Sequence, residues 1–238
     1  MSKEIGRRRA LQASLTGAAA LGMGGIEPAA ASAPRPPRGA YAHNVEAIGY
    51  SDLDHRPAFK MAVRQVRGRW YLYTGHFWHS GWSVAFANSE DVSYGAGPAP
   101  HASIVDISDP AEPWLLSTLP VPVPPAGAPY EDFATRGGWS GPHNMNHHQH
   151  HPDVQRQGNL FYLAHFNAGL RVYDVSNVRL PREVGYFVPP DPARRYGPMP
   201  EDALVAQTED VVVDRRGYIY VSDKNQGLWI LRYTGPRA

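Results

Sequence analysis

Histidine is the residue type through which this sequence could most readily carry out chemistry. The chain has 11 histidines in 238 residues and no cysteine. The lack of cysteine excludes thiolate zinc sites, cysteine nucleophiles and disulfide scaffolds. A dense group of histidines stands between positions 147 and 151. Imidazole and carboxylate ligands without thiolate suit zinc, manganese, iron or copper. The sequence therefore predicts a divalent transition-metal site, provided that the fold gathers these side chains.

A repeated strand pattern would position these side chains. Residues 69–84, 159–176 and 218–231 can be laid over one another. Each segment reads as a strand rich in aromatic and β-branched residues, a tight turn closed by glycine, and a second strand. Glycine suits the turn because it accepts a positive φ without a Cβ clash.

Further strands complete the repeated unit. Residues 103–110 match residues 171–177. Asp106 and Asp174 in these runs are predicted turn formers, because an Asp carboxylate can bond the backbone that follows it. Another strand precedes each hairpin, most clearly at residues 210–217. The unit therefore has four antiparallel strands in about 40 to 45 residues, which predicts an all-β fold, a β-propeller built of four-stranded antiparallel blades.

The alignment gathers histidines and carboxylates on one rim near the central channel of such a propeller. His76, His165 and Asp223 occupy equivalent positions, where the second strand of each unit enters its hairpin. Counting back from the repeat glycines places residues 150–151 opposite residues 209–210. The predicted metal ligands are His76, His147, His148, His150, His151, His165 and Asp223.

The repeat resembles that of secreted LVIVD-repeat β-propeller proteins. The runs that carry the resemblance are Ile104-Val105-Asp106-Ile107-Ser108-Asp109-Pro110, Ala168-Gly169-Leu170-Arg171-Val172-Tyr173-Asp174-Val175-Ser176 and Gly217-Tyr218-Ile219-Tyr220-Val221-Ser222-Asp223. Members of that family usually have about six or seven blades, within the known range of propellers. This chain has room for about four to five, so the resemblance implies a partial propeller. Residues 85–101 are off the pattern, and we expect the missing blades there.

The first 33 residues read as an export signal rather than as part of the fold. Arg7, Arg8 and Arg9 precede a mildly apolar run at 15–25, and small residues follow at 29–33. This order is typical of a signal peptide, here of the twin-arginine type. The apolar run is too short to span a bilayer. We expect residues 1–33 to direct the chain to the periplasm or outside the cell, residues 34–45 to form a linker, and residues 46–238 to form the propeller domain.

Charge and architecture together favour a binding protein. Lys plus Arg number 23 and Asp plus Glu number 22, a formal charge of +1. No basic field exists to attract nucleic acid. We expect an interaction scaffold that holds a protein or small molecule at the propeller rim. The open sheet edges of a partial propeller also invite self-association.

The alternative is a metal-dependent enzyme, namely a lyase, hydrolase or oxidase, with its histidine-rich site at the channel mouth. The metal would polarise a substrate oxygen or activate water. Glu209 or Asp210 would then serve as the base.

Overall fold

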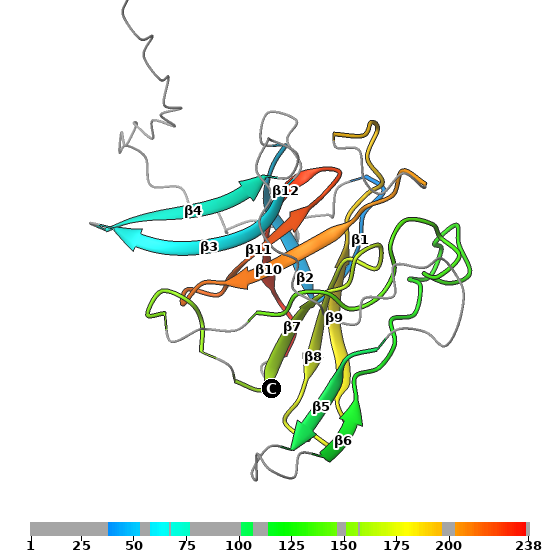
Figure 1. Cartoon of the computed structure of the whole chain (residues 1–238), viewed down its shortest axis with the longest axis horizontal. Helices are drawn as coiled ribbons and strands as arrows, with labels where there is room; N and C mark the ends of the chain where they lie inside the picture. Colours follow the sequence, from blue (N-terminus) through cyan, green and yellow to red (C-terminus); the bar gives the residue numbers. More distant parts are fainter. Residues whose placement is uncertain are drawn as a thin grey trace, which may run out of the picture. The chain divides into compact units, whose positions relative to one another are not determined.

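The computed structural model describes residues 38–52, 58–66, 68–76, 101–106, 114–146, 151–156, 158–196 and 203–236. Every regular element in these ranges is a β-strand (Figure 1). No helix there is long and apolar enough to cross a membrane. The strands are β1 (Tyr41–His43), β2 (Val45–Ser51), β3 (Ala58–Val66), β4 (Arg69–His76), β5 (Ser103–Asp106), β6 (Trp114–Thr118), β7 (Leu160–Ala164), β8 (Leu170–Asp174), β9 (Arg182–Val188), β10 (Thr208–Val213), β11 (Tyr218–Asp223) and β12 (Gly227–Tyr233). The all-β prediction is confirmed.

The strands form two four-stranded sheets and two separate hairpins. The first sheet has the order β1-β9-β8-β7, and the second has the order β10-β11-β12-β2. The hairpins are β3–β4 and β5–β6. All of these pairs are antiparallel. Four-stranded antiparallel units are thus confirmed. The described residues hold two complete units and two halves, where the sequence predicts four or five blades.

Strands from the N-terminal part of the chain complete both large sheets. β2 pairs with β12, and β1 pairs with β9. Residues 41–43 therefore belong to the fold, which corrects the prediction of a linker over residues 34–45. A three-residue strand is too short to show an alternating pattern, and only its pairing with β9 defines it. The predicted junction at 85–101 lies almost entirely outside the described residues.

The two large sheets pack on each other through one apolar core. Side chains alternate between the faces of a strand, so one face of each sheet supplies every second residue. The first sheet contributes Tyr162, Ala164, Leu170, Val172 and Phe187, and the second contributes Val45, Val211, Val213, Ile219, Val221, Trp229 and Leu231. All twelve are buried. This packing fixes the two sheets as neighbouring layers.

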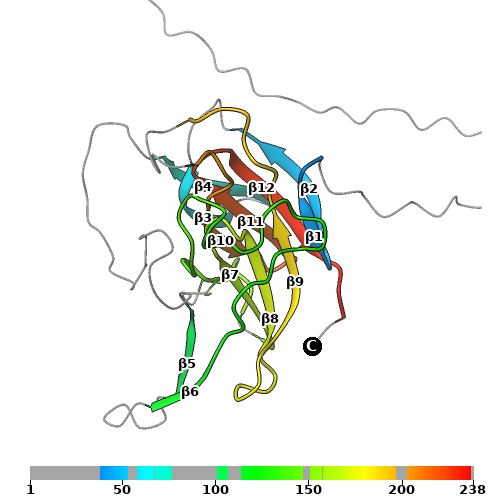
Figure 2. The same ribbon diagram turned by 90° about the vertical axis from the view of Figure 1, so that its right-hand side faces the viewer.

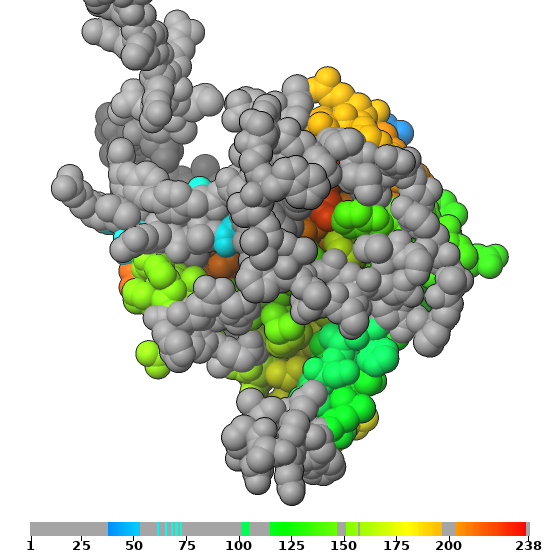
Figure 3. Space-filling model, in the orientation of Figure 1, coloured from blue at the N-terminus to red at the C-terminus, as the bar shows by residue number. Residues whose placement is uncertain are grey.

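Each hairpin covers the opposite face of one large sheet. On the first sheet, Leu163 and Tyr173 point away from the shared core and pack with Ile104 of β5 and with Leu119. On the second sheet, the residues that point away from the core meet the β3–β4 hairpin; these residues are Val212, Tyr220 and Leu228, and they pack with Met61, Trp70 and Leu72. The layers therefore follow the order β5–β6, first sheet, second sheet, β3–β4. Figures 1 and 2 show the two hairpins well separated, and Figure 3 shows β5–β6 (green) on the surface.

Two turn glycines have a similar backbone conformation but differ in the space around them. Gly169 precedes β8 with a φ of +79°, and a Cβ built on it would lie 2.2 Å from the carbonyl oxygen of Phe187. Gly217 precedes β11 with a similar φ of +85°, and no atom lies within 4 Å of its built Cβ. Both positions favour glycine because L-residues rarely adopt a positive φ. Only at Gly169 would a side chain also collide with the neighbouring strand.

We expect Gly169→Ala to destabilise the chain far more than Gly217→Ala. The second change costs about 1 kcal/mol, from the left-handed backbone alone. The first must also push apart β8 and β9, so its cost should be at least twice as large. Urea unfolding of both variants measures the difference. Equal losses of unfolding free energy would contradict the close packing of Gly169 against β9.

Candidate functional site

A buried ion pair lies where β10 begins. Lys224 Nζ is 2.8 Å from Glu209 Oε2, and the exposed fractions of these side chains are only 8% and 1%. Aromatic rings cover the pair. Lys224 Nζ lies 3.7 Å from the centroid of the Trp139 ring, a cation–π contact. The ring of Phe166 packs edge-on against Trp139 at 5.5 Å. Water is thus largely excluded from this charged group.

His143 is the third polar member of this site. Its Nδ1 lies 2.6 Å from the backbone oxygen of Glu209 and 3.6 Å from the Oε1 atom of the same residue. A carbonyl oxygen only accepts, so Nδ1 carries the proton and donates. The His143 ring also stacks on Phe166, with centroids 4.6 Å apart. The site therefore joins an imidazole, a carboxylate and an ammonium beneath two aromatic rings.

Sequence reasoning missed His143 because its strand carries no apolar pattern. Residues 143–146 pair with β7 as β10 pairs with β11. His143 therefore stands level with Glu209. The alignment predicts residues 150–151 at this level, and that prediction is wrong. The chain between residue 146 and β7 is longer than the four-residue turn between β10 and β11. Counting back from Gly158 by the spacing found before Gly217 therefore reaches residues that come after the 143–146 segment.

The predicted acidic residues serve as acceptors for backbone amides. Asp223 is fully buried and accepts bonds from the N–H groups of Gln207 (2.7 Å) and Asn225 (2.8 Å). Burial nevertheless raises the pKa of Asp223 to about 7, and the nearby charge of Glu209 acts in the same direction. Asp210 Oδ2 accepts from the N–H of Met61 at 2.9 Å, which ties β10 to β3. Both carboxylates thus hold neighbouring backbone segments together.

His165 is buried in a different layer. It follows β7, whereas Asp223 ends β11, so the two equivalent residues belong to different sheets of the stack. His165 is 4% exposed, and its Nδ1 has no hydrogen-bond partner among the described residues. Burial, together with the positive charge of Arg171, lowers the pKa of His165 to about 3. The imidazole is therefore neutral at physiological pH.

Among the remaining predicted ligands, only His151 has a described side chain. His151 Nδ1 accepts the N–H of Asp153 at 3.2 Å. The neighbouring Val154 bridges to Asp214, at the opposite end of β10 from Glu209. His147, His148 and His150 lie outside the described residues, and the side chain of His76 is not described. Within the described ranges, no three His, Asp or Glu side chains stand close enough together to hold a metal ion.

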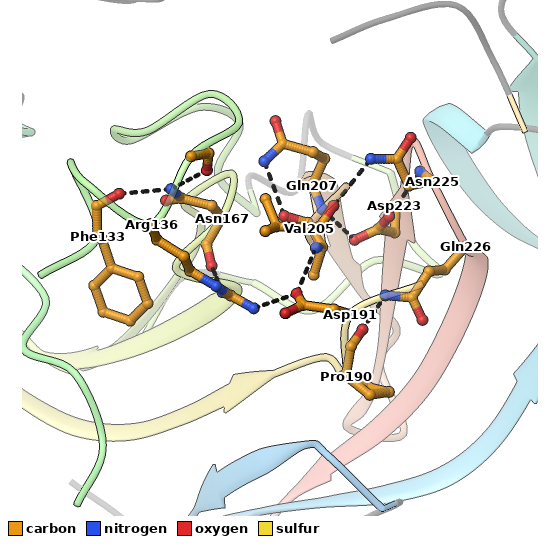
Figure 4. A network of polar contacts seen from close by, with 12 residues as sticks. Phe133, Arg136, Asn167, Pro190, Asp191, Val205, Gln207, Asp223, Asn225 and Gln226 are labelled. Carbon is orange, nitrogen blue, oxygen red and sulfur yellow. Dashed lines mark hydrogen bonds and ion pairs between the residues drawn. The ribbon is translucent and has the colours of Figure 1, made fainter. Parts of the chain in front are cut away.

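Side-chain hydrogen bonds tie together the loops beside this site (Figure 4). Asn167 donates to the carbonyl oxygens of Phe133 (2.6 Å) and Gly137 (2.9 Å). Arg136 donates to the backbone oxygen of Asn167 and pairs with Asp191 at 2.5 Å. Asn167, in the turn between β7 and β8, thereby anchors the loop that contains Phe133, and Arg136 connects this loop to the one after β9.

A second set of bonds anchors the chain that leads into β10. Gln207 Oε1 accepts the N–H of Trp139 at 3.0 Å. Asn225 Nδ2 donates to the carbonyl oxygen of Val205 at 2.9 Å. Gln226 donates to the backbone oxygen of Pro190. We call residues 127–139, 165–169, 189–196, 203–207 and 224–226 the rim loops; they are cross-tied by amide side chains rather than by apolar contacts alone.

These features define a class of protein before any comparison is made: a β-rich repeat protein built from four-stranded antiparallel sheets. The model of one family, described as LVIVD repeat, matches residues 103–119, 151–188 and 207–231. These segments contain β5–β6, β7–β9 and most of β10–β12. The chain therefore carries LVIVD repeats, as the sequence resemblance implies. No curated protein matches the chain.

The opposite pKa shifts of Asp223 and His165 should give opposite pH dependences. Asp223 contributes most to the unfolding free energy below pH about 4, where it is protonated in both the folded and the unfolded chain. This contribution is lost as the pH rises towards 7. His165 contributes fully above pH about 6.5, and its contribution is lost as the pH falls, because the unfolded imidazole takes up a proton that the folded one refuses. Between pH 4 and 6.5 the two effects oppose each other.

We therefore expect the two neutral variants to diverge in slope. Relative to the wild type, the unfolding free energy of Asp223→Asn should rise more steeply with pH between 4 and 6.5, while that of His165→Gln should fall. Denaturant unfolding at several pH values measures both slopes. Parallel pH profiles for the wild type and both variants would show that these groups do not titrate as their burial requires.

Proposed function

We propose that this chain is an exported binding scaffold that holds a protein or small-molecule ligand on its rim loops. The observation that carries this proposal is the set of buried hydrogen bonds that cross-tie these loops (Figure 4). Binding surfaces gain affinity when their loops are ordered before the ligand arrives. Loops held on a rigid sheet scaffold are also the usual carriers of binding residues.

The roles of the acidic residues support a scaffold over a catalyst. Asp223 and Asp210 are occupied by backbone N–H groups. Glu209 is paired with Lys224 under aromatic rings. A general base needs an approach for substrate to its oxygen atoms. In this arrangement the carboxylates instead satisfy buried donors, which is what a fixed loop platform requires.

A metal-dependent enzyme is the second candidate, favoured by one observation. His143 Nδ1 and Glu209 Oε1 lie 3.6 Å apart, at the rim where the repeat predicts chemistry. An imidazole beside a carboxylate is a common pairing in acid–base and metal sites. In this reading the His143 ring, oriented by the Glu209 carbonyl, would carry the reactive nitrogen.

Photo-crosslinking at two exposed positions tests the scaffold proposal. Glu131 lies in a rim loop, and Val178 lies in the turn between β8 and β9 at the other end of these strands. A photoreactive residue at position 131 should give a discrete crosslinked product in the native cell, and one at position 178 should give none. The two positions are both exposed, so the comparison controls for random collision.

Metal analysis of untagged protein tests the alternative. The scaffold proposal expects no stoichiometric zinc, manganese, iron or copper, and no rise in melting temperature when these ions are added. Stoichiometric metal that is lost in His143→Ala would contradict the scaffold and favour the enzyme, since a tightly bound metal stabilises the folded state by mass action.

A further inference from the structure

The two hairpins correspond to complementary halves of one repeat unit. β4 aligns with β7 and β11, each of which has a third strand, β8 or β12, beside it. β5 aligns with β8, which has the second strand β7 beside it. Among the described residues, β4 has no neighbour in the third position and β5 has no neighbour in the second. Within the described ranges, each hairpin therefore lacks the strand that the other supplies; the second strand predicted at the end of residues 69–84 lies outside these ranges.

The free edge of β4 follows from the ladder of its own hairpin. Val66 pairs with Arg69 across a two-residue turn, so this pair exchanges both hydrogen bonds. The alternation of an antiparallel ladder then directs the backbone groups of Tyr71 and Tyr73 towards β3. Those of Leu72 and Thr74 point to the opposite edge.

The free edge of β5 follows in the same way. The N–H of Leu119 donates to the carbonyl oxygen of Ala102 at 2.8 Å. This bond shows that the backbone groups of Ala102 point towards β6, so those of the next residue, Ser103, point away from β6. Ser103 pairs with Thr118 without exchanging hydrogen bonds. The open edge of β5 therefore begins with the backbone groups of Ser103 and continues with those of Val105.

The complete first sheet shows that these open groups match. The N–H of His165 donates to Gly169, and the N–H of Val175 donates to Asn159. By alternation, the bonded pairs inside the β7–β8 ladder are Phe161↔Tyr173 and Leu163↔Arg171. Carried over by the repeat alignment, these pairs become Leu72↔Val105 and Thr74↔Ser103. The alignment and the hairpin ladders thus independently select the same four residues.

One chain cannot make this ladder with itself in the observed fold. The β5–β6 hairpin covers the outer face of the first sheet through Ile104. The β3–β4 hairpin covers the outer face of the second sheet through Met61 and Leu72. Two complete sheets lie between the hairpins, so their open edges meet only if another molecule supplies one of them.

The number of layers limits which assembly closes. In the part of the chain that the structure describes, two complete units and two halves make three repeat units. Propellers close with about four to eight blades. A single copy has too few units for a ring and three copies have too many, whereas two copies give six.

We propose that two copies of this chain form a two-fold symmetric dimer in which β4 of each copy pairs with β5 of the other. Each of the two junctions completes one four-stranded blade, and the dimer closes a six-bladed ring. The contacts are reciprocal, as a closed two-fold interface requires. Both open edges are removed at once, which is how natural β-proteins avoid continued edge-to-edge association.

A matched pair of proline variants tests the role of the β5 edge. Ser103 and Thr118 are both exposed and face each other across the hairpin, but their N–H groups point to opposite edges. The full chain should have about twice the mass of 26.2 kDa in light scattering. Ser103→Pro should be monomeric with an unchanged far-UV spectrum, because proline removes only the open-edge donor. Thr118→Pro should remain dimeric.

Cysteine pairing provides a second readout that does not depend on a proline. The chain has no cysteine of its own, and hydrogen-bonded antiparallel partners lie about 5.5 Å apart at Cα, a distance that a disulfide can span. A mixture of Thr74→Cys and Ser103→Cys chains should form a disulfide-linked heterodimer on mild oxidation. Neither variant alone should link to itself.

Three outcomes would overturn the proposal. A wild-type chain that is monomeric at micromolar concentration forms no such junction. A disulfide formed within one chain of the double variant Thr74→Cys/Ser103→Cys would place the two edges together in a single copy. A ladder of ever larger species would show that the junctions form without closing a ring of two.

Discussion

A sheet with two apolar faces needs a neighbour on each side, and this constraint organises the described part of the chain. Strands β7–β8 and β10–β12 each carry apolar residues on both faces. The faces that meet form the shared core, and the outer faces are covered by β3–β4 and β5–β6. Because every layer covers a face of the next, the described part of the chain is a stack with the two hairpins as its outer layers. Repeat proteins share this dependence on nearest neighbours.

The ends of the strands have a different chemistry from the stack. Apolar residues hold the layers together, whereas buried amides and carboxylates hold the rim loops. Asp223, Gln207 and Asn225 form one continuous set of hydrogen bonds, and Asp191 and Arg136 extend it to the loop after β9. The bonds of Asp223, Gln207 and Asn225 are strengthened because they are buried away from water. The loops are thereby fixed relative to the sheets, which is the property on which a binding role depends.

Equivalent positions of the repeat have acquired different side chains with different consequences. His165 directly follows the second strand of its unit and Asp223 ends that of the next, yet burial lowers the pKa of the first and raises the pKa of the second. In each case the charged form is disfavoured by the same cause, removal from water. The position is therefore defined by its environment between layers, and either a neutral imidazole or a carboxyl bonded by amides can occupy it.

The hairpins and the four-stranded unit could be predicted from the sequence alone, because alternation and turn chemistry are local properties, whereas the short strand β1 could not. Asp174 illustrates this: it is predicted as a turn former, and its Oδ1 accepts the N–H of Ser176 at 2.9 Å. Which residues meet at the site depends on contacts between distant parts of the chain. His143 reaches Glu209 through an irregular strand with no apolar pattern, and His151 is carried to the far end of β10 by the connection beside it. Long-range register depends on loop length and on packing between layers, and neither is encoded in a local pattern.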